Sequence, residues 1–67
     1  MTDDWQERLR REFTELGERV EKLRAFIGSP GFFALSEVER NDLTEQETHM
    51  TRYGHVLLRR VIRADVH

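Results

Sequence analysis

The chain lacks cysteine altogether, and it has a single proline and four glycines among its 67 residues. Without cysteine, neither a disulfide framework nor a thiolate zinc site can stabilise so short a chain. Its three histidines, His49, His55 and His67, also lack the four-residue spacing that places two imidazoles on one helical face. We therefore expect no metal and no cofactor. A domain of about 60 residues buries only about 60% of the surface that its unfolded chain exposes, so self-association is the remaining source of stability.

Long hydrophobic runs are also missing. No apolar stretch approaches the ~20 residues that a membrane-spanning helix needs, and the start of the chain, with Asp3 and Asp4, lacks the basic residues of a signal peptide. We expect a cytoplasmic protein that does not bind membranes. Eleven Lys and Arg face thirteen Asp and Glu, which gives a formal net charge of -2. This balance, together with the lack of a helix-turn-helix pattern, disfavours DNA binding.

The first half of the chain carries one apolar stripe. Its members are Trp5, Leu9, Phe13, Leu16, Val20, Leu23 and Ile27. Steps of three and four residues are typical of one face of an α-helix. We predict a helix over about residues 4–27 that begins at a cap from Asp3 or Asp4. Gly28, in the left-handed conformation, and Pro30 are expected to end it.

Two serines predict the next two helix starts. Ser29 precedes Pro30, which favours a short helical turn over about 30–35. Ser36 and Glu39 form the pattern of a capping box, which predicts a second long helix over about 37–64. The short connection favours antiparallel neighbours. The predicted fold is all-α: a single domain over residues 1–67, formed by an antiparallel helical hairpin that self-associates into a helical bundle.

The register of the hairpin can be estimated by counting outward from the turn. This places Leu16 beside Met50 and Leu9 beside Leu57. A glycine inside a helix costs about 1 kcal/mol relative to alanine, so Gly54 needs a compensating contact. We expect it to lie close to an aromatic side chain such as Phe13, and the alternative is a bend in the helix at this position.

Apolar side chains remain that one partner helix cannot cover, and we assign them to an oligomer interface. They are Trp5, Phe32, Phe33, Val56, Leu58 and Ile62. Exposed apolar patches of this kind often mark interfaces. A dimer forming a four-helix bundle is the simplest closed solution, and higher symmetric oligomers are the alternative. The alternative is that the short helical turn and the helix ends cover them.

Arginine dominates the basic residues, with ten Arg and one Lys, and several lie near the end of the second helix. One explanation is that they complement the helix dipole. The other is an anion site, since antiparallel pairing brings arginines of both helices together and guanidinium groups suit phosphate. The candidate ligand-binding residues are Arg8, Arg11, Arg52, Tyr53, His55, Arg59, Arg60 and Arg63.

Catalytic patterns are weak. His49 and His55 have no adjacent serine or cysteine nucleophile, and the many carboxylates lie on exposed helical faces that would not tune them for acid–base work. No glycine-rich phosphate loop follows a strand. We therefore expect a protein that is not an enzyme.

The turn and the second helix carry an unusual pattern. The segment Leu23-Arg24-Ala25-Phe26-Ile27-Gly28-Ser29 is followed by Phe32, Phe33, Leu35, Glu39, Leu43, Gln46, Met50, Tyr53, Leu57 and Arg59-Arg60-Val61. Over about residues 9–63, this sequence resembles a family of small proteins of tailed bacteriophages that are related to a crAss-like phage protein. The resemblance implies a phage accessory protein and brings no catalytic residues.

For a small phage protein of this kind we expect a counter-defence or host-modulating role that is exerted by binding. The sharpest version is sequestration of a cyclic nucleotide immune signal by a helical oligomer in the host cytosol. The alternative is a structural or regulatory module that binds a host or phage protein through the exposed apolar side chains.

Overall fold

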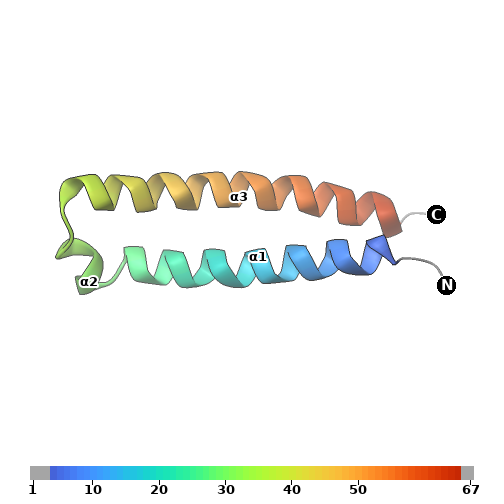
Figure 1. Cartoon of the computed structure of the whole chain (residues 1–67), viewed down its shortest axis with the longest axis horizontal. Coiled ribbons are helices and arrows are strands. Elements are labelled where there is room, and N and C mark those ends of the chain that lie inside the picture. Colours follow the sequence, from blue (N-terminus) through green and yellow to red (C-terminus); the bar gives the residue numbers. More distant parts are fainter. Residues whose placement is uncertain (1–3, 66–67) are drawn as a thin grey trace.

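The computed structural model describes residues 4–65 and folds them into three helices, α1 (Trp5–Ile27), α2 (Pro30–Phe33) and α3 (Glu37–Asp65). Figure 1 shows α1 and α3 running antiparallel, with the short α2 at the turn and both termini at the opposite end. The all-α helical hairpin predicted from the sequence is confirmed for these residues. No helix within the described range is long and apolar enough to cross a membrane. Asp3 and His67 lie outside the described residues.

The start of α1 is capped as the sequence suggests, but its end differs from the prediction. The Asp4 Oδ1 atom accepts a hydrogen bond of 3.1 Å from the Glu7 amide. Gly28 has φ -90° and ψ 3°, and no residue in the described range has a positive φ. The predicted left-handed Gly28 is therefore wrong. The Ser29 amide and hydroxyl both donate to the Phe26 carbonyl, at 2.9 and 2.6 Å, so the turn satisfies this terminal carbonyl without a left-handed residue.

Serine caps also begin the other two helices. Ser29 Oγ accepts from the Phe32 amide at 3.4 Å, and Ser36 Oγ accepts from the Glu39 amide at 3.2 Å. Arg40 of α3 also contacts the connection between α2 and α3, because its guanidinium donates a hydrogen bond to the Leu35 carbonyl at 2.6 Å. A further bond from Arg40 to the Phe33 carbonyl, at 3.4 Å, joins the end of α2 to the first turn of α3.

The core lies along the seam between α1 and α3. Its buried side chains are Leu9, Leu16, Val20, Leu57 and Ala64, with Phe13, Met50 and Val61 partly buried against them. A second, smaller cluster lies at the turn, where Phe32 is buried and packs edge-to-face against Phe26 and Phe33. Phe32 is thus covered within its own chain, while Phe33 remains exposed.

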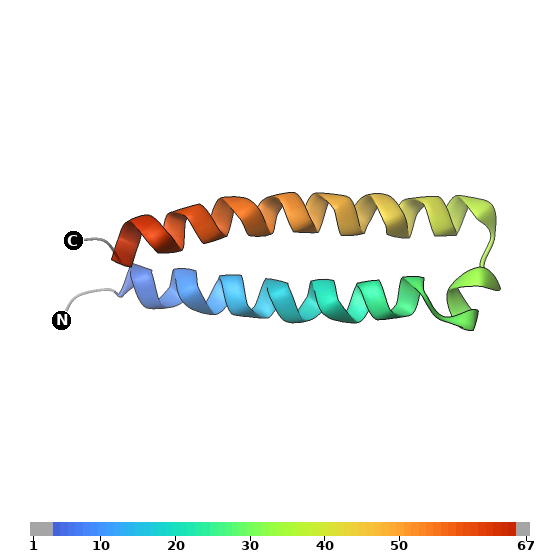
Figure 2. The same ribbon diagram turned by 180° about the vertical axis from the view of Figure 1, so that it is seen from behind.

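The register between the long helices differs from the prediction by about one helical turn. A Cβ placed on Gly54 would meet Leu16 Cδ2 at 3.6 Å, and no other residue comes within 4 Å of that position. Gly54 was predicted beside Phe13, and this contact is wrong, because its neighbour on α1 is Leu16; Leu16 and Met50 line the same groove, as their predicted proximity requires. In both views α2 lies beside the start of α3, and α1 lies beside α3 only from there towards the termini (Figures 1 and 2). Because α2 takes up this space, α1 pairs with residues of α3 that are further from the turn.

Candidate anion-binding face

The hairpin has two long flanks, and arginines and aromatic residues gather on one of them. Residues on a helix are about 100° apart, so positions on either side of the buried seam fall on opposite flanks. We call one flank the basic face. It comprises Trp5, Arg8, Glu12, Glu15 and Arg19 of α1 and Tyr53, Val56, Arg60 and Arg63 of α3.

Two shallow hollows meet on the basic face at Trp5 and Arg60. The larger, of about 370 Å³, is completed by Arg63 and Ala64. The smaller, of about 180 Å³, also includes Arg8. Trp5 begins α1 and lies opposite the small side chain of Ala64, which is too short to cover an indole. The Trp5 side chain therefore stays 47% exposed, with arginines of both helices around it.

Tyr53 lies on the same face and is held by Glu12 of the facing helix. The Tyr53 hydroxyl donates a hydrogen bond to Glu12 Oε2. This bond is the main reason why the pKa of Tyr53 is raised above its ordinary value of 10.0, and desolvation adds to it. The positive charges of Arg60 and Arg19 act in the opposite direction and lower the pKa of Tyr53. The phenol thus has a fixed position within the field of these arginines.

The structure divides the predicted ligand-binding residues among different surfaces. Arg8, Arg60 and Arg63 come together around Trp5, and Tyr53 lies on the same face. The other predicted residues lie elsewhere.

Position relative to the buried seam explains their separation. Arg11 follows buried Leu9 by two residues and Arg59 follows buried Leu57 by two, so both point away from the partner helix, as Arg52 does. His55 lies on the opposite flank. Trp5, which the sequence assigned to an oligomer interface, belongs with the arginines, and Arg19 was missed. A helical-wheel projection made with the observed register would have grouped them.

The basic face has the chemistry to bind an anion that carries an aromatic base. Arg8, Arg60 and Arg63 gather around Trp5 on it, and guanidinium groups form bidentate hydrogen bonds with phosphate. The half-exposed indole of Trp5 offers a surface on which a base can stack. Between residues 4 and 65, no group of three or more metal-ligating side chains is placed to hold a metal ion.

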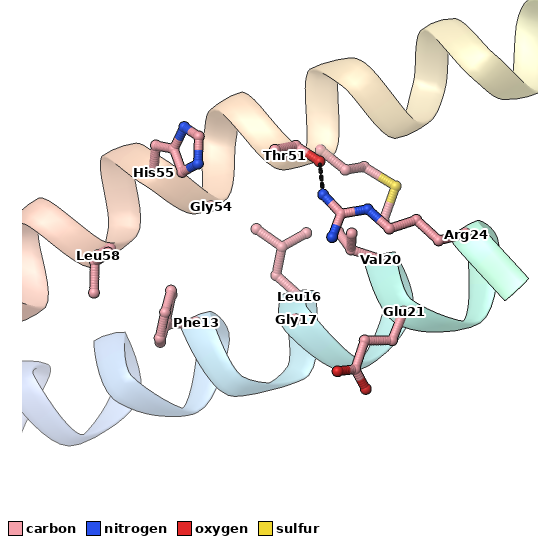
Figure 3. A pocket seen from close by; sticks show the side chains of 11 residues that line it. Phe13, Leu16, Gly17, Val20, Glu21, Arg24, Thr51, Gly54, His55 and Leu58 are labelled. Atoms are coloured by element: carbon pink, nitrogen blue, oxygen red, sulfur yellow. Dashed lines mark hydrogen bonds between the residues drawn. The ribbon is translucent and has the colours of Figure 1, made fainter.

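The opposite flank, which we call the groove face, is apolar at its centre. It holds an open groove of about 290 Å³ between α1 and α3 (Figure 3). The groove face comprises Phe13, Gly17, Val20, Glu21 and Arg24 of α1 and Met50, Thr51, Gly54, His55, Leu58 and Ile62 of α3. Leu16 forms part of the floor of the groove.

Both ends of the groove face carry ion pairs. At the turn end, Arg24 donates to Glu47 at 2.8 Å and to Thr51 at 2.9 Å. The hydrogen bonds from Arg24 and Thr51 lower the pKa of the Glu47 carboxyl below its ordinary value of 4.5. At the other end, Arg10 pairs with Asp65 at 2.9 Å. Arg24, Glu47, Arg10 and Asp65 are thus paired within the chain, and Glu21 adds a carboxylate at the rim of the groove.

The geometry defines a small antiparallel helical hairpin with one basic, aromatic flank and one apolar, grooved flank. The chain belongs to the Sequestin family, whose family model matches residues 3–63. This match includes all of the segment that resembles small phage proteins, and the family's name is consistent with a binding or sequestering role. No curated protein and no solved structure matches the chain significantly.

Proposed function

We propose that this protein sequesters a small anionic ligand that carries both phosphate and an aromatic base, with a cyclic nucleotide signal as the sharpest form. The observation that carries the proposal is the convergence of Arg8, Arg60 and Arg63 around the half-exposed Trp5. The protein acts by binding, without catalysis, as a self-associated helical bundle in the cytosol. The resemblance to small phage proteins supports a counter-defence role, in which capture of the ligand removes an immune signal from the host.

The contacts available on the basic face determine the ligand class. Hydrogen bonds to charged groups contribute about 1.5–3 kcal/mol each, and stacking of a base on an aromatic side chain contributes about 1–3 kcal/mol. A free phosphate would use only the arginines, whereas a nucleotide would use Trp5 as well. The pairing of arginines with an indole therefore favours a nucleotide over a simple anion.

Calorimetry of the purified protein with cyclic di-adenylate, cyclic di-guanylate, cyclic tri-adenylate and cyclic ADP-ribose tests the proposal. We expect at least one of them to bind, and Arg60→Gln to weaken that binding by about tenfold or more. Arg52→Gln is the matched control, because Arg52 lies on the same helix but points away from α1. Circular dichroism checks that both variants remain helical.

Two results would overturn the proposal. One is that no member of the panel binds. The other is that a member binds and the Arg60→Gln and Arg52→Gln variants bind it as tightly as the wild type does. In either case the arginines near the end of α3 complement the helix dipole and do not form a ligand site.

A second candidate function, a module that binds another protein, is favoured by the turn end of the hairpin. Phe33 and Val38 are 66% and 69% exposed there, and neither contributes to the basic face. If this function holds, Phe33→Ser and Val38→Ser would abolish binding to a protein partner and leave nucleotide titrations unchanged.

A further inference from the structure

The isolated hairpin exposes more surface than a compact chain of its mass. Its accessible area is 5255 Å², about 800 Å² more than the roughly 4,450 Å² expected for a folded monomer of 8.0 kDa. Its radius of gyration is 15.4 Å, against about 11 Å for a compact domain of this length. An excess of about 800 Å² equals the area that each partner contributes to a standard protein interface.

Gly17 has no explanation within its own chain. A Cβ placed on Gly17 would meet no atom within 4 Å, so packing inside the hairpin does not require glycine. Inside a helix the residue nevertheless costs about 1 kcal/mol relative to alanine. Gly17 lies in the apolar groove together with Gly54 of the facing helix (Figure 3). Two glycines at the centre of one groove let another polypeptide approach both helices closely.

Charge decides which flank can face a second copy of the same chain. The basic face presents Arg60 and Arg63 beside Trp5, so pairing of two such faces brings these positive charges together when no anion lies between them. The groove face is apolar in the middle, and the ion pairs Arg24–Glu47 and Arg10–Asp65 lie at its two ends. Two groove faces therefore meet without leaving these charges unpaired.

We infer that the groove face is the surface through which two copies of this chain pair, around a two-fold axis that passes between the hollow at Gly17 and Gly54 and the side chain of Leu58. In an isologous contact the same surface serves on both copies. Leu58 and Ile62, which are 40% and 53% exposed, form an apolar ridge on the terminal side of the groove. The two-fold places the ridge of each copy against the glycine-lined hollow of the other, which gives a four-helix bundle.

This inference rests on the self-association in the proposed function and specifies its geometry. Pairing through the groove faces leaves both basic faces directed outward. Each chain then keeps its own complete set of Trp5, Arg8, Arg60 and Arg63. The dimer is expected to bind one nucleotide per chain.

Sedimentation equilibrium of the full chain with two matched variants tests the interface. Leu58 and Val56 are both 40% exposed on α3, but Leu58 lies on the groove face and Val56 on the basic face. We expect the wild type and Val56→Glu to have twice the chain mass and Leu58→Glu to have the chain mass. The measurement is made at about 0.1 mM protein, a concentration at which a dimer with a micromolar dissociation constant is almost fully formed. A monomeric wild type at that concentration would overturn the inference. So would a Leu58→Glu variant that remains dimeric.

A second pair of variants tests the interface independently, in case Leu58→Glu unfolds the hairpin. Gly17→Arg places a long charged side chain in the groove, where the hairpin itself has space for it, whereas Ala25→Arg places the same side chain on the exposed outer side of α1. Only Gly17→Arg is expected to give a helical monomer. If both variants are dimers, the groove face is not the interface. Calorimetry on the Gly17→Arg monomer separates the two proposals, because the ligand site is expected to survive there even though the dimer is lost.

Discussion

Two glycines at the turn differ in what surrounds them. A Cβ on Gly28 would lie no closer than 3.9 Å to its nearest neighbours, the carbonyl oxygens of Ala25 and Arg24. A Cβ on Gly31 would lie 3.3 Å from Phe26 Cε1, which is tighter than ordinary contact. Since Gly28 has a negative φ, its backbone conformation is open to any residue. Only Gly31 is required by packing.

We predict that Gly28→Ala stabilises the protein by about 0.4–1 kcal/mol, because alanine restricts the unfolded chain and fits the native backbone. Gly31→Ala should destabilise it by about 1 kcal/mol, because the Phe26 ring must move. Urea unfolding followed by circular dichroism at one protein concentration measures both changes. A loss of more than about 1 kcal/mol in Gly28→Ala would indicate that the residue is left-handed after all.

Tyr53 reports on the basic face, since it is the single tyrosine of the chain. We predict that Glu12→Gln lowers the pKa of Tyr53 towards its ordinary value, because the hydrogen bond to the Glu12 carboxylate is what chiefly raises it. Arg60→Gln should raise the pKa further, because the Arg60 charge lowers it. Tyrosinate absorbance during alkaline titration gives the midpoint, with Glu18→Gln on the outer side of α1 as the control.

The sign of the associated pH dependence follows from the raised pKa. The Tyr53–Glu12 interaction contributes stability that is fully present below the pKa of tyrosine in the unfolded chain, and this stability is lost as the pH rises through the folded-state pKa. An unchanged Tyr53 midpoint in Glu12→Gln would show that the two side chains do not interact in solution.

At the scale of the helices, the sequence was sufficient to predict the elements but not their register. Capping serines and the spacing of apolar residues are local signals, and Ser29 and Ser36 cap α2 and α3 in the structure. The register depends on how much space the turn occupies, which is a tertiary property. Phe32 packs against Phe26 of α1, and α2 lies beside the start of α3. Counting outward from the turn ignored that space and misplaced the pairing by about one helical turn.

The seam between α1 and α3 supplies most of the packing energy, and Leu57 is its fully buried centre, with 0% exposure. We predict that Leu57→Ala destabilises the protein by about 2–5 kcal/mol through lost burial and the cavity left behind. Val38→Ala, at a position that is 69% exposed on the same helix, should change stability by less than about 0.5 kcal/mol. Thermal unfolding measures both variants, and equal effects would mean that the seam lies on another face of α3.

For the whole molecule, the sequence shows that arginines gather towards the end of the second helix, but it cannot sort them by flank. Arg59 and Arg60 are neighbours in sequence, yet Arg59 points away from α1 while Arg60 lies beside Trp5. The flank of each residue is set by the register and by which positions are buried. For the same reason the sequence shows the apolar character of Trp5 but not its arginine neighbours from α3, and its assignment to an oligomer interface stays a prediction.

The central claim, that a nucleotide binds at the basic face, can be tested through the single tryptophan of the chain. Trp5 lies in the hollow between Arg8, Arg60 and Arg63. Titration with the cyclic nucleotide panel, with tryptophan emission as the readout, should give a saturable change at one nucleotide per chain. The change should be weakened in Arg60→Gln and retained in Arg52→Gln. A nucleotide that binds by calorimetry without altering Trp5 emission would contradict this account.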